Sequence, residues 1–398
     1  MSTGIKDSVA VVGMGCTRFG YRYDASMDDL MIDAVLECLA DANLTLEDID
    51  AYWFGTSISL SSGLGFSNTL KTQDKPVTRV ENMCGTGTDA FRNACYAVAC
   101  GAYDVVMAIG MEKLNDNGYS GLIFQQYDLD NTYPDFTAPA LFGLLCAGYS
   151  TKFGVSFEEL RNAMMAVSYK NHFNGALNDK ATFRKVVPLD QIAKSPLVAP
   201  PYMTVMDCSG VSDGCACAII MRADMAKKHR KDPMFVKALN FTADSGRNRS
   251  HSSYEFATID GTARCAEGLY KQAGITDPVK DLSLIEFHDC FTITEICLYE
   301  SLGLSELGSG WKDVLDGKFS IDGKIPVNID GGLKSFGHPI GATGLRMLYE
   351  PWLQFHGRAG KRQMENPRYA LTHNLGGEPY NAIAAMTIVS CEEGYEGK

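Results

Sequence analysis

The chain has 398 residues, of which 45% are hydrophobic and 21% are charged. These proportions suit one large or two to three ordinary globular domains, and they exclude a disordered or collagen-like chain. Acidic residues outnumber basic ones by 48 to 36, and the resulting net charge of -12 disfavours a surface for nucleic acid or for anionic membranes. The 13 cysteines form no Cys-x-x-Cys pair, the chain starts without an apolar signal region, and no apolar run approaches the length of a membrane span. We therefore expect a soluble cytoplasmic protein with free thiols.

The first part of the sequence alternates apolar strands with amphipathic helices. Val9 to Val12 predict a buried strand, and the apolar spacing from Met27 to Leu39 predicts a helix that begins with a capping box at Ser26 and Asp29. The elements expected next are strands over 48–54 and 78–83, a helix over 89–100 and a strand over 105–110. This order predicts an α/β protein of stacked layers with a mostly parallel sheet.

Residues 115–207 differ in composition from the segments on either side, because they are rich in aromatic residues and proline. One helix is predicted there, capped by Ser156 with Glu159 three residues later. The segment is too apolar for a disordered linker, so we interpret it as an insertion into the first half of the chain. An apolar strand over 215–221 returns to that half, and the second half begins near Phe235.

The two halves repeat the same order of elements. Residues 41–54 and 272–287 each end a helix, turn and enter a strand, and each stretch precedes a glycine-rich junction, at 84–88 and 337–344. Chance similarity could explain the first match alone, but it does not explain the repeated order. We therefore predict a duplicated α/β domain. The predicted boundaries are 1–114 and 208–232 for the N-terminal half, 115–207 for the inserted loop domain and 233–398 for the C-terminal half.

Cys84 lies between a predicted strand and a glycine-rich turn that leads into a helix. Unpaired backbone N–H groups and the helix dipole favour a thiolate at such a position. A cysteine before a glycine-rich turn is nevertheless more often structural than nucleophilic. The second half of the chain adds His288 and Cys290 at the end of the predicted strand 282–287, and His338 at a glycine-rich elbow. Because open α/β sheets bind ligands at the carboxyl ends of their strands, these residues together favour a functional site.

Four motifs stand out, at 82–87, 288–291, 331–333 and 337–344. Taken together, they resemble those of the thiolase superfamily, and within it the sterol-carrier-protein type and its archaeal and bacterial relatives. The resemblance covers nearly the whole chain, including the insertion. It implies a thiolase fold, which is a duplicated five-layer α-β-α-β-α architecture with an inserted loop domain that covers coenzyme A. It also implies a homodimer or a dimer of dimers. The motifs are Asn82-Met83-Cys84-Gly85-Thr86-Gly87, His288-Asp289-Cys290-Phe291, Gly331-Gly332-Leu333 and Gly337-His338-Pro339-Ile340-Gly341-Ala342-Thr343-Gly344.

The resemblance implies a catalytic role for each motif. Cys84 is expected to be the nucleophile that accepts the acyl group, and His338 the base that activates it. His288, with a water, is expected to form an oxyanion hole for the thioester or enolate oxygen. The backbone N–H of Cys84 and one from Gly376 or Gly377 are expected to form a second oxyanion hole.

The sequence departs from ordinary thiolases at the second catalytic cysteine. Those enzymes carry it in a Cys-x-Gly motif near the C-terminus, and the matching place here reads His373-Asn374-Leu375-Gly376-Gly377. In the sterol-carrier-type group the thiol comes from the His-Asp-Cys-Phe motif instead. We therefore expect Cys290 to move the proton at C2 of the acyl-CoA, with His373 as a less favoured rival.

The implied activity is that of a thiolase, which cleaves a 3-oxoacyl-CoA with coenzyme A or runs the reverse Claisen condensation. Coenzyme A is then a co-substrate, and no cofactor or metal is bound permanently. Two alternatives stay open: a thiolase-fold aldolase that splits a CoA-bound side chain, and a non-catalytic subunit that presents acyl-CoA to a partner. Related aldolases rely on tyrosines, so Cys84, Cys290 and His338 count against the first alternative. Intact Cys84 and His338 count against the second. Several relatives work with a small partner that has an OB-fold and a zinc ribbon.

Other sequence features carry less weight. Arg247 and Arg249 are candidates to approach the nucleotide of coenzyme A, and a plain surface loop is the alternative interpretation. The basic run 227–231 is better explained as a solvated helix end. Cys215 and Cys217 lack partners at metal-ligand spacing. The aromatic residues of the insertion permit a pocket for a bulky acyl group, such as that of benzoylsuccinyl-CoA, and acetoacetyl-CoA is the other candidate substrate. Packing within the insertion is the safer interpretation of these aromatic residues. They are Phe124, Tyr127, Tyr133, Phe136, Phe142 and Tyr149.

Overall fold

The computed structural model describes residues 4–117, 137–250 and 253–394. The strands are β1 Val9–Cys16, β2 Ala51–Gly55, β3 Val77–Val80, β4 Val105–Glu112, β5 Leu197–Ala199, β6 Met203–Thr204, β7 Gly214–Arg222, β8 Met234–Ala243, β9 Leu284–Phe287, β10 Tyr369–Glu378 and β11 Asn381–Ser390. The α-helices are α1 Met27–Ala42, α2 Gly63–Leu70, α3 Thr86–Ala99, α4 Ala138–Phe153, α5 Phe157–Ala176, α6 Leu189–Ala193, α7 Ala223–His229, α8 Arg247–Ser250, α9 Asp260–Ala273, α10 Pro278–Asp281, α11 Thr292–Ser301, α12 Gly310–Leu315, α13 Gly332–Ser335 and α14 Thr343–Phe355.

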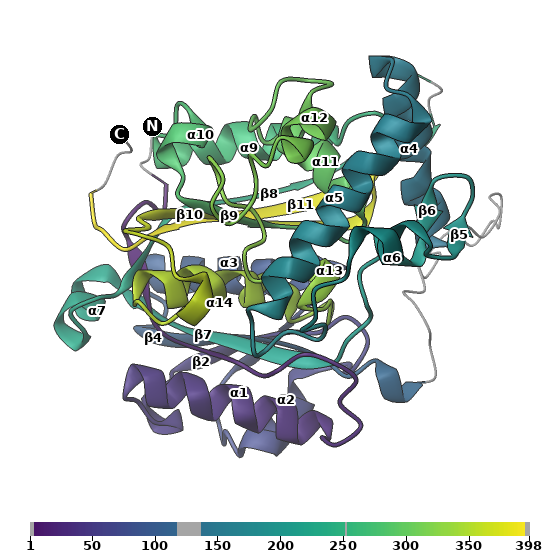
Figure 1. Ribbon diagram of the computed structural model, residues 1–398. Coiled ribbons are helices and arrows are strands. Elements are labelled where there is room, and N and C mark those ends of the chain that lie inside the picture. The colour runs from purple at the N-terminus through teal and green to yellow at the C-terminus, as the bar shows by residue number, and fades with distance from the viewer. Residues whose placement is uncertain (1–3, 118–136, 251–252, 395–398) are drawn as a thin grey trace.

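Nine strands form a connected sheet in the order β3-β2-β4-β7-β1-β8-β11-β10-β9. Figure 1 shows that they lie in two layers, with β2, β4 and β7 in one and β8 to β11 in the other. The layers are joined where β1 pairs with β8 over two positions, Ala10 with Phe235 and Val11 with Met234.

The expectation of a mostly parallel sheet is wrong. Parallel pairs join β2 to β3, β2 to β4 and β9 to β10. The strands between them, from β4 through β7, β1, β8 and β11 to β10, pair antiparallel. The alternation of strands and helices along the chain explains the parallel pairs. It could not reveal that β7 and β11, which close the two halves, enter their sheets in the opposite direction.

Helices complete five layers (Figure 1). The helices α1 and α2 cover the outer face of the first sheet layer, α9 to α12 cover the outer face of the second, and α3 and α14 lie between the two. Local sequence signals account for these helices. In α1, for example, the Ser26 side chain accepts from the Asp29 backbone N–H while the Asp29 side chain accepts from the Ser26 N–H, which is the predicted capping box. The five-layer α-β-α-β-α prediction is confirmed.

The second half repeats the arrangement of the first. The series β1, α1, β2, α3, β4, β7 corresponds in order and pairing to β8, α9, β9, α14, β10, β11. Even the edge strand β3 has a counterpart, because Val327 forms a parallel bridge with Ile285 of β9. The central helices α3 and α14 are therefore equivalent elements of the two halves, and the segment that precedes each of them faces the same interior region.

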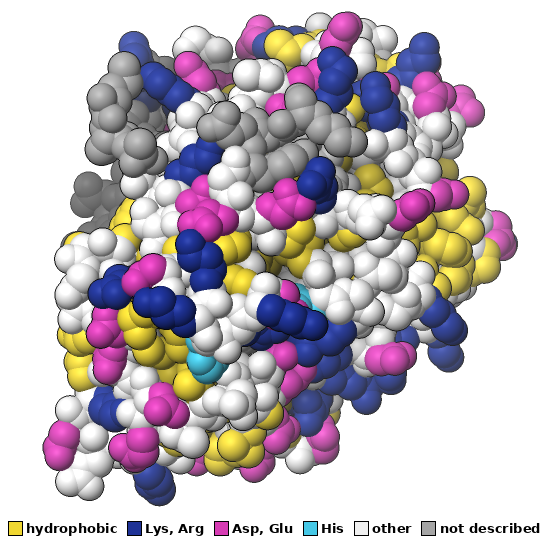
Figure 2. Space-filling view, turned by 90° about the vertical axis from the view of Figure 1, so that its left-hand side faces the viewer, with side chains coloured by type: hydrophobic (Ala, Val, Ile, Leu, Met, Phe, Trp, Pro, Cys, Tyr) yellow, Lys and Arg dark blue, Asp and Glu magenta, His cyan; other side chains and the backbone are white. Residues whose placement is uncertain are grey.

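The surface mixes charges of both signs. Figure 2 shows Lys and Arg side chains interspersed with Asp and Glu over most of one face. Within the basic run 227–231, Lys227 pairs with Glu393 at 2.8 Å and Arg230 with Asp232 at 2.8 Å. These ion pairs favour the interpretation of the run as a solvated helix end. Among the described residues, we find no helix with both the length and the apolar character that a bilayer span requires.

Candidate active site

Cys84 lies in the turn between β3 and α3. The turn is closed by backbone hydrogen bonds from Gly85 N–H to the Asn82 carbonyl, at 3.0 Å, and from Thr86 N–H to the Met83 carbonyl, at 3.1 Å. Met83 has a left-handed backbone with φ of 51°, which is unfavourable for a residue with a side chain. Strain of this kind concentrates at functional sites. The helix begins at Thr86, three residues earlier than the sequence predicted, and Cys84 directly precedes its N-cap, Gly85.

Two histidines converge on this cysteine. His288 directly follows β9, and His338 lies in the elbow that leads into α14. One nitrogen of each ring and the Cys84 sulfur all lie within 4.8 Å of one another. The two imidazole planes are nearly perpendicular, with ring centroids 5.1 Å apart. Three residues that are 50 to 254 positions apart in the sequence thus meet in one place, as the motifs predicted.

The hydrogen bonds of His338 define its tautomer. Its Nδ1 lies 2.7 Å from the hydroxyl oxygen of Thr343, and that hydroxyl donates its only hydrogen to the Pro339 carbonyl at 2.8 Å. The Thr343 oxygen can therefore only accept from His338, so the imidazole carries its hydrogen on Nδ1. Its Nε2 is buried and has no hydrogen-bond partner among the described residues. Burial lowers the pKa of His338 to about 3, which leaves a neutral ring with a free lone pair on Nε2.

The electrostatics of Cys84 differ from the sequence expectation. Burial, followed by the negative charge of Glu81, raises the pKa of the Cys84 thiol to about 12. The backbone N–H groups of Cys84 and Gly377 act in the opposite direction and lower the pKa. The favourable effect of these two N–H groups on the thiolate is therefore outweighed by desolvation. The resting pair is a neutral thiol beside a neutral imidazole.

Cys290 lies close to this group without being a member of it. Cys290 is buried, and its sulfur lies 3.7 Å from the hydroxyl oxygen of Thr294 in the first turn of α11. Burial raises its pKa, and the charge of Cys84 raises it further, so the two thiols influence each other electrostatically. The Cys290 carbonyl accepts from the Ser209 N–H at 2.8 Å, which holds the segment 207–210 against the site.

The C-terminal half contributes the end of β10. A Cβ on Gly376 would lie 3.0 Å from the Asn82 carbonyl oxygen, so this strand touches the turn that carries Cys84. His373 lies on the opposite face of β10, where its Nε2 lies 2.9 Å from the Thr262 hydroxyl of α9. Its side chain therefore points away from Asn374, whose side chain contacts His288. The preference for Cys290 over His373 agrees with this geometry.

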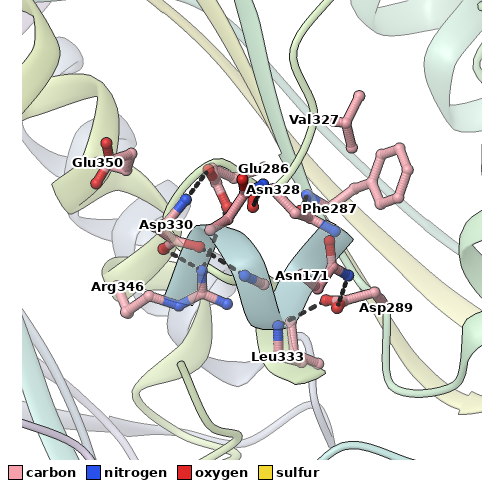
Figure 3. Close-up of polar contacts among 12 residues, drawn as sticks. Asn171, Glu286, Phe287, Asp289, Val327, Asn328, Asp330, Leu333, Arg346 and Glu350 are labelled. Carbon is pink, nitrogen blue, oxygen red and sulfur yellow. Dashed lines mark hydrogen bonds and ion pairs between the residues drawn. The ribbon is translucent and has the colours of Figure 1, made fainter. Parts of the chain in front are cut away.

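A buried polar network supports the His288 segment (Figure 3). The Asp289 carboxylate accepts from the backbone N–H of Leu333 at 2.6 Å and from the Asn171 side chain at 2.7 Å. These bonds connect the strand end to α13 and α5. Beside them, fully buried Arg346 pairs with Asp330 and lies 3.4 Å from Glu286. Sequence reasoning missed this network, because its members come from four separate segments, and the motifs that contain Asp289 and Leu333 do not show that these residues pair with Asn171 or lie beside Arg346.

The remaining predicted residues fall in different places. Arg247 and Arg249 lie on α8, directly after β8, and the side chain of Arg249 lies outside the described part of the structure. Of the aromatic residues in the insertion, Phe124, Tyr127, Tyr133 and Phe136 lie outside the described residues. Phe142 and Tyr149 are buried on α4, where Phe142 packs against Phe291 and Tyr149 contacts Glu300. For these two, packing is the interpretation that the structure supports.

All 13 cysteines are free thiols. Within the described ranges, Cys84, His288 and His338 are the one group of His, Cys, Asp and Glu whose ligand atoms are close enough to hold a metal ion. Thiolate and imidazole are ligands that Zn²⁺ prefers. Cys215 and Cys217 are buried in β7 and belong to no such group.

Comparison with known proteins agrees with this geometry. Residues 9–199 match the family described as thiolase, N-terminal domain, and residues 243–389 match the thiolase C-terminal domain-like family. The acetyl-CoA acetyltransferase of Methanothermobacter thermautotrophicus is 36% identical over 96% of this chain and 99% of its own length. The chain belongs to the thiolase family. It is therefore an enzyme of the acyltransferase class, as predicted.

Three further comparisons agree with this family. Sterol carrier protein 2 of Bos taurus is 32% identical over 94% of this chain and 70% of its own length. Among solved structures, the Ltp2-ChsH2(DUF35) aldolase has a TM-score of 0.81 at 22% identity, covering 97% of this chain and 98% of that one. Human mitochondrial 3-ketoacyl-CoA thiolase in complex with CoA has a TM-score of 0.68 at 20% identity, covering 96% and 98%. At these identities the structural likeness shows the thiolase fold.

Proposed function

We propose that this thiolase cleaves a 3-oxoacyl-CoA with coenzyme A, or runs the reverse condensation, through an acyl-enzyme on Cys84. Two observations carry this function: one ring nitrogen of His338 lies within 4.8 Å of the Cys84 sulfur, and Nε2 of His338 has no hydrogen-bond partner among the described residues. A neutral thiol needs a base at the moment of attack, and a buried imidazole nitrogen with no other partner supplies one.

In the first half of thiolysis, the Cys84 sulfur attacks the 3-oxo carbon while its proton passes to His338 Nε2. The backbone N–H groups of Cys84 and Gly377 (or Gly376) hold the tetrahedral oxygen, and His288 holds the thioester oxygen. The C2–C3 bond then breaks, and its electron pair forms the enolate of the shortened acyl-CoA. Cys290 protonates C2 and becomes a thiolate.

In the second half, the thiol of free coenzyme A gives its proton to the Cys290 thiolate and attacks the acyl group on Cys84. Cys84 leaves as a thiolate and recovers the proton that His338 holds. Both thiols and the imidazole are then in their starting states. His338 thereby returns to the neutral form that burial favours.

The binding of coenzyme A is assigned from the family. We propose that the inserted loop domain, 115–207, covers coenzyme A, and that Arg247 and Arg249 approach its phosphates. Acyl-CoA and coenzyme A are then the small-molecule partners, and the 3-ketoacyl-CoA thiolase solved with CoA supports this assignment. Replacing both arginines with Ala is expected to raise the KM for coenzyme A and to leave acylation of Cys84 by saturating 3-oxoacyl-CoA unchanged.

We also propose a homodimer or a dimer of dimers in the cytoplasm. The free state of all 13 cysteines supports a reducing compartment. A small partner with an OB-fold and a zinc ribbon is a further proposal, which the DUF35 protein in the name of the aldolase structure supports. Full activity of the purified homomer would remove the need for that partner.

The second candidate function is that of an aldolase, which the TM-score of 0.81 to the Ltp2-ChsH2(DUF35) aldolase favours. An aldolase reaction releases a ketone or aldehyde and needs no acyl acceptor. The convergence of Cys84, His288 and His338 supports the thiolase function instead, because an aldolase has no use for an activated thiol.

A substrate screen separates the two functions. Purified enzyme is assayed with short-chain, long-chain and aromatic 3-oxoacyl-CoAs, including acetoacetyl-CoA and benzoylsuccinyl-CoA, with and without free coenzyme A. We expect cleavage that depends on coenzyme A, its loss in Cys84→Ala, and its retention in the matched variant Cys95→Ala, whose thiol is buried in α3 away from the turn. Release of a ketone or aldehyde without coenzyme A would establish the aldolase instead.

A further inference from the structure

Asn374 lies in the segment 373–377, at which the resemblance places the missing Cys-x-Gly motif of ordinary thiolases. Asn374 is fully buried on β10. An amide cannot serve as an acid or base near neutral pH, so its presence beside the reacting groups calls for a different role. That role follows from the two contacts of its side chain.

The first contact orients the amide. The Thr88 hydroxyl of α3 donates to Asn374 Oδ1 at 2.6 Å, a length typical of an O–H···O bond and short for an N–H donor. The bond is enclosed by α14, because a Cβ on Gly344 would lie 2.2 Å from Thr88 Oγ1 and 2.9 Å from Asn374 Oδ1. With Oδ1 directed at Thr88, the amide nitrogen must face the other way.

The second contact is to His288. Asn374 Nδ2 lies 3.4 Å from His288 Nδ1, at the long end of hydrogen-bond distances. Because the amide nitrogen is only a donor, Nδ1 of His288 must be the acceptor. A neutral imidazole that accepts at Nδ1 carries its hydrogen on Nε2. His288 is neutral, since burial and the neighbouring His338 hold its pKa well below the ordinary value.

The two histidines thus have opposite tautomers. Thr343 places the hydrogen of His338 on Nδ1 and leaves Nε2 as a base. Thr88 and Asn374 place the hydrogen of His288 on Nε2, which makes that atom a donor. A base beside the thiol and a donor beside the developing oxyanion are what the proposed reaction needs. Two neutral imidazoles in the same tautomer could not divide these tasks.

We propose that Asn374 is a positioning residue, oriented by the Thr88 hydroxyl, that holds His288 as the Nε2–H tautomer and so creates the oxyanion-hole donor. This inference deepens the proposed function and rests on it for the role of His288. The tautomer itself is a property of the resting enzyme and does not depend on which substrate is cleaved.

The test compares three single variants of the full-length enzyme. Thr88→Val removes the hydroxyl at constant shape, so the amide can turn and offer Oδ1 to His288. Thr88→Ser keeps the hydroxyl. The matched control is Thr387→Val, because Thr387 is also buried in a strand but its hydroxyl has no hydrogen-bond partner among the described residues.

Two readouts follow the effect. The first is the ¹⁵N spectrum of enzyme labelled at its 7 histidines, with the His288 signals assigned by a His288→Asn variant. The second is steady-state thiolysis. We expect Nε2–H His288 in the wild type, Thr88→Ser and Thr387→Val, and a shift toward Nδ1–H in Thr88→Val. In the same variant, kcat should fall by about 10-fold to 100-fold while the KM for coenzyme A stays unchanged, because the His288 donor of the oxyanion hole is lost in part or in full.

An Nδ1–H signal for His288 in the wild type would overturn the inference, as would equal kcat in Thr88→Val and Thr88→Ser. A wild-type enzyme that forms no acyl group on Cys84 would contradict the proposed function instead, while the ¹⁵N result would still decide the tautomer.

Discussion

The Cys84 thiol is desolvated although the residue is partly exposed, and this desolvation predicts how the thiol responds to pH. Its pKa rises from 9.0 to about 12, which corresponds to about 4 kcal/mol against the thiolate. At pH 7 the thiolate fraction is then about 10⁻⁵, compared with about 10⁻² for an unperturbed thiol. We expect the rate of alkylation of Cys84 by iodoacetamide in the free enzyme to rise about tenfold for each pH unit from 6 to 10, with no plateau.

The assay follows carbamidomethylation of the peptide that contains Cys84 by quenched-flow mass spectrometry. A Cys100→Ser background removes the exposed thiol at the C-cap of α3, and Cys84→Ala measures the signal from other cysteines. A rate that saturates below pH 8 would refute the reasoning, because it would mean that Cys84 and His338 form a stable thiolate–imidazolium pair in the resting enzyme.

Three further predictions concern charge and burial. Because burial lowers the pKa of His338 to about 3, kcat/KM should show no ionisation near pH 6.5, and a bell-shaped profile with an acid limb there would contradict the assignment. Burial lowers the pKa of Lys334 from 10.5 to about 8. Between pH 8 and pH 10.5 the unfolded chain therefore binds more protons than the folded chain, and the free energy of unfolding rises with pH by about 3 kcal/mol in total. The free energy of unfolding of Lys334→Met, measured in urea, should lack this rise. If it increases with pH as steeply as in the wild type, Lys334 is not the source. Arg346→Met should lower the free energy of unfolding by about 3 to 5 kcal/mol, because Asp330 and Glu286 then stay buried without the Arg346 guanidinium. A loss below 1 kcal/mol in urea denaturation would show that the network contributes little to stability.

Much of the fold could be predicted because its signals are local. The capping box at Ser26, the strand before Cys84 and the glycine-rich elbow at His338 each lie within a few consecutive residues. The repeated order of elements then placed Cys84 and His338 before equivalent helices of the two halves. The direction of β7 could not be predicted in the same way, because β7 follows the long inserted segment, whose path no local pattern reveals.

The supporting contacts of the site were beyond sequence reasoning for a related reason. Thr88 and Asn374 are separated by 286 positions, and an isolated threonine or asparagine carries no reactive signature. The pKa of Cys84 could not be anticipated either. Its position before a helix suggested a thiolate, whereas the extent of burial and the nearby charge of Glu81 emerge only from the packed structure.

The most direct test of the proposed reaction is intact-mass spectrometry of the enzyme after brief exposure to a 3-oxoacyl-CoA without free coenzyme A. We predict an increase equal to the transferred acyl group minus one hydrogen, located on the peptide that contains Cys84 and removed when coenzyme A is added. An adduct that persists in Cys84→Ala, or turnover of the same substrate with no adduct in the wild type, would contradict the account.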